Sequence, residues 1–429
     1  MKKLYHNTLE YFYKLESRIA FYPTLLSLAG IIFAFLMIYI ESKGISGYLV
    51  EKAPFLVVND TETARTLLTT FIAGLISIMV FSFSMVMILL NQASSNFSPR
   101  VLPGLISNSR HQIVLGIYNS TLFYCIFTLV SIEQDGDKYQ LPGFSVLLGI
   151  LGMSLCLCAF IYFIHSISQE IQVNNIMRRI FNTAKKRLVD LIEEQNQIST
   201  DFPETDKWAF LNSVESGYIQ DVSIHTIAAI AEDENLKFEI IPVKGIYNLK
   251  GSPIIKYNGD INDEIKEKLL ASFHYSQSEL IEDNYVLAFK QLTEIAVKAM
   301  SPGINDPGTA INAIDYITEL FLLRIKKNDN SFIYDYRGIA NVSINAFSFK
   351  DLIYNTMSSL RTYCKHDNII VQKLMQMLSL LLKSETFARV DYKNSLKKEI
   401  DNLYEDATNS LKNSEDLNRL DLAYQNITS

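Results

Sequence analysis

Long apolar stretches occur only in the first 166 residues of the chain. Four of them have the length of an α-helix that crosses about 30 Å of hydrocarbon, roughly 20 residues. They run over Tyr22–Ile40, Leu67–Leu90, Ile113–Ile132 and Phe144–His165. The pattern predicts an α-helical membrane protein with four transmembrane helices, followed by a large domain outside the bilayer.

Beyond residue 166 the pattern changes twice. Residues 167–200 keep a helical spacing of apolar positions, which predicts a rigid strut that continues the fourth span. Residues 201–260 alternate short strand patterns with turns at Gly217 and Lys250-Gly251-Ser252, as in a small mixed α/β module. Residues 261–429 return to helical spacing, so we expect a mostly α domain there. Residues 1–21 form a juxtamembrane segment, and residues 22–166 form the transmembrane domain.

Charged residues that flank the spans predict the orientation of the chain. Basic residues on short loops mark the cytoplasmic side of a membrane. They gather before the first span, between the second and third spans, and after the fourth. The residues are Lys2, Lys3, Lys14, Arg18, Arg100, Arg110, Arg178, Arg179, Lys185, Lys186 and Arg187. With four spans all three regions share one side, so both termini and the C-terminal domain are expected in the cytoplasm.

Composition narrows the range of partners and chemistry. After His165 the chain has 29 basic and 37 acidic residues, and a net-acidic domain disfavours nucleic acid. Cys125, Cys156 and Cys158 lie in the spans and Cys364 lies in a predicted helix, without metal-ligand spacing. No catalytic motif occurs either. We therefore expect no enzyme, no cofactor and no metal, and a lipid bilayer as the first partner.

The second span carries a polar row at every seventh residue, formed by Thr70, Ser77, Ser84 and Asn91. Positions seven apart drift by only about 20° around a helix, so these side chains share one face. Such a row can line a water-filled path or hydrogen-bond to a neighbouring helix. No Asp, Glu, Lys or Arg lies deep within a span. This disfavours a proton-coupled transporter but leaves a passive pore open.

The fourth span carries a strip of small residues instead. Ser145, Gly149, Gly152, Cys156 and Ala159 recur at steps of four and three residues. Such a strip lets two helix backbones approach closely. We expect a helix–helix contact along it, either within one subunit or between subunits.

A tight turn joins two predicted helices of the C-terminal domain. Pro302-Gly303 ends the first helix, and Asp306 caps the second, in which Pro307 takes the first position. Free amides at the start of a helix favour anions, which makes the turn a candidate ligand site. Its candidate residues are Ser301, Gly303, Asn305, Asp306 and Thr309. Since the Asp306 carboxylate competes for the same helix end, a purely structural turn is the favoured alternative.

Around this turn, Ala299–Ala310 resembles an uncharacterised bacterial family of predicted membrane proteins, the domain of unknown function numbered 2254. Further similarities lie at Ser98-Pro99-Arg100, Leu115-Gly116, Pro142 and Ser216-Gly217-Tyr218. The chain differs at Gln277-Ser278-Glu279, where the family pattern favours an Arg-Thr pair. The resemblance implies a multi-pass protein of the bacterial inner membrane, and it implies no established activity.

Two functions stay open from the sequence. The first is a homo-oligomeric ion channel or pore, lined by the polar row and gated by the cytoplasmic domain. The second is a membrane-anchored sensing or scaffolding module that binds a ligand or protein on the cytoplasmic side. Four spans exceed the need of a simple anchor, which favours the pore.

Overall fold

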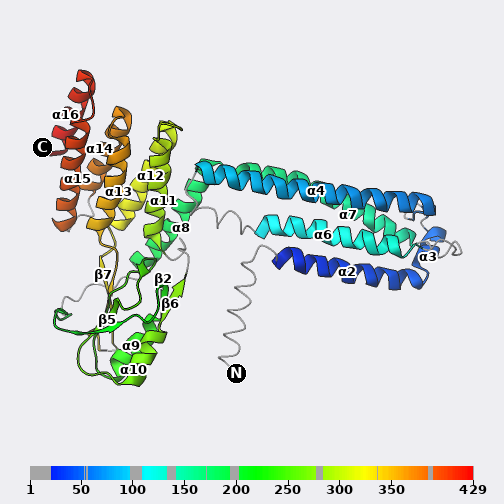
Figure 1. Cartoon of the computed structure of the whole chain (residues 1–429), viewed down its shortest axis with the longest axis horizontal. Helices are drawn as coiled ribbons and strands as arrows, with labels where there is room; N and C mark the ends of the chain where they lie inside the picture. The colour runs from blue at the N-terminus through cyan, green and yellow to red at the C-terminus, as the bar shows by residue number, and fades with distance from the viewer. Residues whose placement is uncertain are drawn as a thin grey trace. The chain divides into compact units, whose positions relative to one another are not determined.

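The computed structural model divides the chain into two compact units, the N-terminal unit (residues 1–172) and the C-terminal unit (residues 173–429). It describes residues 21–52, 54, 57–96, 109–132, 142–170, 172–193, 202–276, 284–335, 337–384 and 390–428. Residues 1–20 of the expected juxtamembrane segment, Ser98-Pro99-Arg100 and Gln277-Ser278-Glu279 lie outside the described residues. Figure 1 labels the elements in chain order.

The N-terminal unit is helical wherever it is described, apart from short turns. Its helices are α2 (Phe21–Ser42), α3 (Ile45–Lys52), α4 (Thr61–Asn96), α6 (Ser109–Val130) and α7 (Gly143–Glu170). Among the described residues, four helices are long and apolar enough to cross a membrane, and they coincide with the four predicted spans. Large apolar side chains such as Ile32 and Ile161 stay exposed on their outer faces, as in helices that contact lipid.

Close contacts at two glycines hold α2 against α6. A Cβ atom on Gly30 would lie 2.5 Å from the carbonyl oxygen of Ser120, and one on Gly116 would lie 2.5 Å from Cδ1 of Leu26. Both distances are well inside van der Waals contact. The two helices can pack this closely only because Gly30 and Gly116 have no side chains.

A carboxylate from α2 caps the N-terminus of α7. Oε1 of Glu41 accepts hydrogen bonds from the backbone N–H of Ser145 at 2.8 Å and from its hydroxyl at 2.9 Å. Oε2 accepts from the Ser46 hydroxyl at 2.6 Å, and Oγ of Ser46 accepts from the N–H of Phe144 at 3.0 Å. Negative charge at a helix N-terminus is favourable, so these bonds join the ends of α2, α3 and α7.

Two small sheets form one part of the C-terminal unit. The strands are β1 (Ala209–Asn212), β2 (Gly217–Val222), β3 (Phe238–Ile240), β4 (Tyr247–Asn248), β5 (Pro253–Tyr257), β6 (Phe273–Ser276), β7 (Asn330–Tyr334) and β8 (Ala340–Asn345). One sheet has the order β1-β5-β3-β8-β7, with β3 and β8 parallel, and the other has the order β4-β2-β6. Helices α9 (Ile224–Asp233) and α10 (Asp263–Ala271) complete this part around a core that includes Ile227, Phe238, Ile254 and Leu269.

Helices form the rest of the unit. They are α8 (Val173–Glu193), α11 (Tyr285–Ala299), α12 (Pro307–Arg324), α13 (Phe349–Cys364), α14 (Asn368–Lys383), α15 (Val390–Thr408) and α16 (Ser414–Thr428). Successive pairs stack in chain order: α11 and α12 pack on α13 and α14, which pack on α15 and α16 (Figure 1). Helix α8 packs against α11 and α12, so it belongs to this array.

The structure corrects two expectations. The predicted strut is not one helix with the fourth span, because α7 ends at Glu170 and α8 begins at Val173. The apolar face of α8 is buried among its neighbours. The α/β module is also larger than residues 201–260, because β6, β7 and β8 from the predicted helical region complete its sheets.

Candidate ligand pocket of the C-terminal unit

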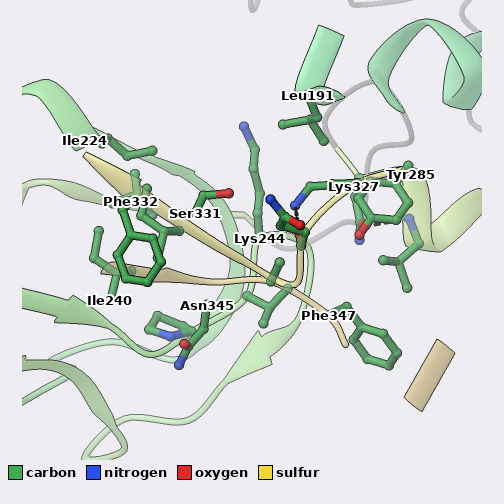
Figure 2. A pocket seen from close by; sticks show the side chains of 18 of the residues that line it. Leu191, Ile224, Ile240, Lys244, Tyr285, Lys327, Ser331, Phe332, Asn345 and Phe347 are labelled. Atoms are coloured by element: carbon green, nitrogen blue, oxygen red, sulfur yellow. Dashed lines mark hydrogen bonds between the residues drawn. The ribbon is translucent and has the colours of Figure 1, made fainter. Parts of the chain in front are cut away.

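A cavity of about 300 Å³ lies where α8, the five-stranded sheet and the start of α11 meet. Its walls come from segments far apart in the sequence, and Figure 2 shows their side chains around the space. The lining residues are Arg187, Leu191, Asp221, Val222, Ile224, Ile240, Pro242, Val243, Lys244, Asn284, Tyr285, Val286, Lys327, Asn328, Ser331, Phe332, Ile333, Tyr334, Ile344, Asn345, Ala346 and Phe347. Most of this surface is apolar, which is the common composition of a small-molecule site.

The charged side chains of the lining are mostly basic. Arg187 comes from α8, Lys244 follows β3, and Lys327 follows α12, whereas Asp221 is the one carboxylate among the lining residues. Nζ of Lys244 lies 2.9 Å from Oδ1 of Asp221, so that carboxylate already has a cationic partner. The cavity therefore has a net positive charge.

Lys327 is the most buried of these cations, with 4% of its surface exposed. Its ammonium group donates a hydrogen bond to the carbonyl oxygen of Asn328 at 2.8 Å. Burial lowers the pKa of Lys327 to about 8, helped by the positive charges of Arg324 and Arg187 and opposed by the negative charge of Asp329. Burial raises the free energy of the protonated, charged form of this lysine. A bound anion would offset that penalty.

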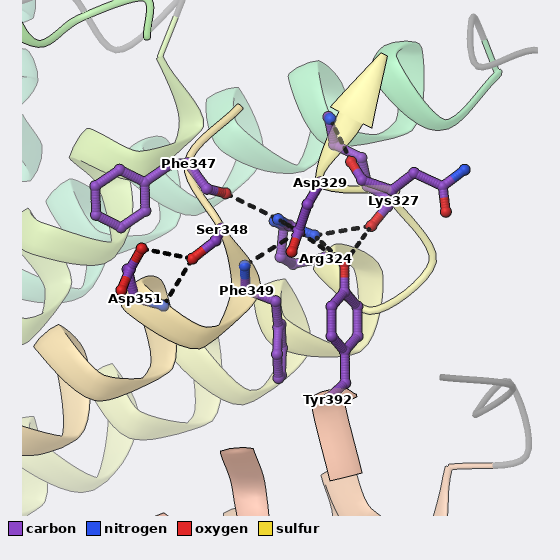
Figure 3. Close-up of polar contacts among 9 residues, drawn as sticks. Arg324, Lys327, Asp329, Phe347, Ser348, Phe349, Asp351 and Tyr392 are labelled. Atoms are coloured by element: carbon purple, nitrogen blue, oxygen red, sulfur yellow. Dashed lines mark hydrogen bonds and ion pairs between the residues drawn. The ribbon is translucent and has the colours of Figure 1, made fainter. Parts of the chain in front are cut away.

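A buried ion pair behind the cavity fixes the segment that carries Lys327 (Figure 3). Arg324 is fully buried at the end of α12 and pairs with Asp329. Its guanidinium also donates to the carbonyl oxygens of Lys327 at 2.8 Å and Phe347 at 2.9 Å. The same carboxylate oxygen of Asp329, Oδ1, also accepts from the Tyr392 hydroxyl at 2.7 Å. These bonds hold two lining segments, residues 327–328 and the chain at Phe347, in one arrangement.

The start of α11 reaches the cavity because of a glycine. Asn284 caps this helix by accepting from the N–H of Val286 at 3.0 Å. Gly245 has a φ of +81°, and a Cβ atom there would lie 1.8 Å from Nδ2 of Asn284. Only glycine combines this backbone conformation with so close an approach.

The polar row of the second span lies on the outer face of α4. Thr70, Ser77, Ser84 and Asn91 are all exposed instead of packed against other helices of the chain. The hydroxyls of Thr70 and Ser77 donate to the carbonyl oxygens of Thr66 and Ala73, one turn earlier in the same helix. Such bonds satisfy a hydroxyl without a neighbouring helix.

The strip of small residues in α7 lies inside the N-terminal unit. Ser145, Gly149 and Cys156 are buried, and Gly152 and Ala159 are partly buried. A Cβ atom on Gly152 would lie 3.0 Å from Cγ2 of Thr121 in α6, and one on Gly149 would lie 3.3 Å from Cδ2 of Leu68 in α4. The strip therefore packs against α4 and α6 of the same chain.

The turn before α12 is exposed and closed by its own hydrogen bonds. Asp306 accepts from the N–H of Thr309 at 3.1 Å and from its hydroxyl at 2.5 Å. These bonds lower the pKa of Asp306. Ser301 donates to the carbonyl oxygen of Lys298, and Asn305 adopts a left-handed φ of 49°. Gly303 is exposed nearby. Because the Asp306 carboxylate occupies the helix end, this arrangement favours the structural turn over a ligand site.

Comparison with known proteins places the chain in a family. A family model described as a predicted membrane protein, DUF2254, matches residues 16–379. The chain belongs to the DUF2254 family.

Within the described residues, no cluster of three or more His, Cys, Asp or Glu side chains suits a metal ion.

Mycobacterial proteins are among the relatives of this DUF2254 member. An uncharacterised protein of Mycobacterium bovis is 24% identical over 357 residues, which cover 79% of this chain and 67% of the relative. Uncharacterised proteins of two Mycobacterium tuberculosis strains match to the same extent. No solved structure matches the chain.

Sequence reasoning missed the cavity of this DUF2254 protein. Arg187 entered only as a flanking charge, and Lys327 was not among the candidate residues. A signal was present in Lys326-Lys327-Asn328-Asp329, a polar run between an apolar helix and a β-strand. Only the tertiary structure shows which lysine of that run is buried.

Proposed function

We propose that this protein is a membrane-anchored receptor whose C-terminal unit binds a small molecule in the cavity beside Lys327. The observation that supports the proposal is the cavity itself, lined by α8, strands of the five-stranded sheet and the start of α11. About 300 Å³ is enough for a compact metabolite and too little for a folded partner. The apolar helices hold the unit at the membrane, and the flanking charges favour the cytoplasmic side.

The position of α8 in the chain supports a sensing role. Arg187 and Leu191 of α8 line the cavity, and only two residues separate the start of α8 from the end of α7, the last apolar helix. A ligand in the cavity therefore contacts the helix that follows the membrane-spanning region in the chain. A change in the position or order of α8 is the simplest signal that such a receptor could give.

A cavity-filling variant tests this proposal. Trp208, the single tryptophan of the chain, lies in the C-terminal unit, so its fluorescence reports the unfolding of that unit in full-length protein in detergent. We expect the small-molecule filtrate of a bacterial cell extract to raise the melting temperature of the wild-type protein. Ser331→Phe should lose this increase, because its ring occupies the cavity.

Ser414→Phe is the matched control, since Ser414 is exposed at the start of α16 and lies outside the cavity lining. This variant should respond to the filtrate like the wild type. An equal response of Ser331→Phe and wild type would show that no cavity ligand causes the increase, and the receptor proposal would be abandoned.

A homo-oligomeric pore is the second candidate, and the outward polar row of α4 favours it. Thr70, Ser77, Ser84 and Asn91 do not face the other helices of their own chain, so several copies could bring these rows together around an axis. The hydrogen bonds of Thr70 and Ser77 within α4 weaken this argument, because they satisfy the hydroxyls without a partner.

Reconstitution into lipid vesicles tests the pore. If the row lines a path, the wild-type protein should conduct ions, and Ser77→Leu should reduce the conductance. Phe83→Leu, at an exposed apolar position about 100° around the same helix from Ser84, should leave it unchanged. Vesicles without ion flux over a range of voltage and pH would exclude this candidate.

A further inference from the structure

We infer that the cavity binds a compact molecule with an anionic group at one end and an apolar body, such as a single ring, at the other. This inference rests on the proposed receptor function and adds the chemical class of the ligand.

The charge of the lining favours a negative partner. Three cations face one carboxylate, Asp221, and that carboxylate is already paired with Lys244. Arg187 and Lys327 also line the cavity, and no carboxylate other than Asp221 is present in the lining. Because like charges in a partly desolvated space repel, an anion between them would stabilise the occupied state.

The hydrogen-bond donors of the basic lining residues also favour an anionic ligand. An ammonium group has three donors, and the structure gives Nζ of Lys327 one acceptor, the carbonyl oxygen of Asn328. Nε of Arg187 is buried and has no hydrogen-bond partner among the described residues. Lys327 lines the cavity with two donors left, so its ammonium group marks where a ligand oxygen would lie, whereas Nε of Arg187 has almost no surface open to a ligand.

The apolar part of the lining is separate from these donors. Figure 2 shows Ile224, Ile240 and Phe332 on one side of the space, and Lys327 and Tyr285 on the other. Ile224, Ile240 and Phe332 offer an aliphatic and aromatic surface without formal charge. A ligand that carried only charge would leave this surface unfilled, and a purely apolar ligand would leave Lys327 unpaired.

Size separates this class from larger anions. About 300 Å³ lies at the lower end of the volumes of small-molecule sites. It suits one ring or a short branched chain with one phosphate or carboxylate. A nucleic acid or an extended acidic peptide would need an open groove.

Three probes on the full-length protein in detergent test the inference: phenyl phosphate, phenol and inorganic phosphate. Binding is measured by calorimetry and by the Trp208 melting curve. We expect phenyl phosphate to bind more tightly than inorganic phosphate, which lacks the ring, and phenol to bind weakest. A charge-assisted hydrogen bond contributes about 10- to 100-fold in affinity, and Lys327→Met should weaken phenyl phosphate binding by this factor.

Lys326→Met is the matched control, because it makes the same chemical change at the neighbouring exposed lysine. It should bind phenyl phosphate like the wild type. Equal affinity of wild type and Lys327→Met, no binding of phenyl phosphate, or tighter binding of phenol would overturn the inference. If phenol binds tightly and Ser331→Phe removes that binding, the receptor function stands while the anionic class fails.

Discussion

Replacing Arg324 with alanine is expected to lower the free energy of unfolding of the C-terminal unit by roughly 3–5 kcal/mol. Arg324 is fully buried and pairs with Asp329, and its guanidinium satisfies the carbonyl oxygens of Lys327 and Phe347. Its removal leaves a carboxylate and two carbonyl oxygens without this donor in a place that water reaches poorly. Chemical denaturation of the full-length protein, followed by Trp208 fluorescence, measures the loss.

Arg419→Ala provides the comparison for this variant. Arg419 pairs with Glu415 at 3.1 Å on the exposed surface of α16, with about two thirds of each side chain in solvent. Exposed pairs of this kind contribute little, so the denaturation midpoint should barely move. If the two alanine variants lost similar stability, the central role given to the Arg324–Asp329 pair would be wrong.

Lys327→Met is expected to stabilise the unliganded protein by about 2 kcal/mol at neutral pH. Lowering the pKa of Lys327 from 10.5 to about 8 corresponds to a penalty of roughly 3 kcal/mol for the buried ammonium. The lost hydrogen bond to Asn328 offsets about 1 kcal/mol of the gain. A variant that is more stable and binds less tightly is typical of a position kept for function.

The stabilisation should depend on pH with a definite sign. The pKa of Lys327 is lower in the folded protein, so between about pH 8 and 10.5 the unfolded chain binds more protons and the wild type gains stability as the pH rises. The advantage of Lys327→Met is therefore complete below pH 8 and disappears towards pH 10.5. Lys326→Met should show no such trend, and a pH-independent difference between wild type and Lys327→Met would contradict the assignment.

The sequence predicted the four long apolar helices well because their signal is local. Each of the four spans needs only its own run of apolar residues, and the run over Phe144–His165 lies within α7. The end of that helix was harder to predict. Residues 166–197 contain no Pro or Gly, so nothing local separates Glu170 from Val173, and the apolar face of α8 is explained by packing on α11 and α12.

In the C-terminal unit the arrangement of the strands depends on residues far apart in the sequence. The strands over Tyr218–Val222 and Pro253–Tyr257 were predictable from alternation and turns, but β8 pairs in parallel with β3 across about 100 residues. No local pattern reveals such a partner. The cavity likewise depends on long-range packing, because its lining residues Arg187 and Lys327 lie 140 positions apart in the chain. Their proximity is a property of the tertiary structure alone.

The cap of α7 has a consequence for biosynthesis. Glu41 leaves the ribosome with the first apolar helix, whereas Ser145, which supplies two of its hydrogen bonds, belongs to the last. Until that helix is made, the carboxylate lacks these donors. It is then more stable in water than among apolar side chains. Closure of the bundle at this end is therefore a late step of synthesis, and a chain truncated before residue 143 would leave Glu41 without them.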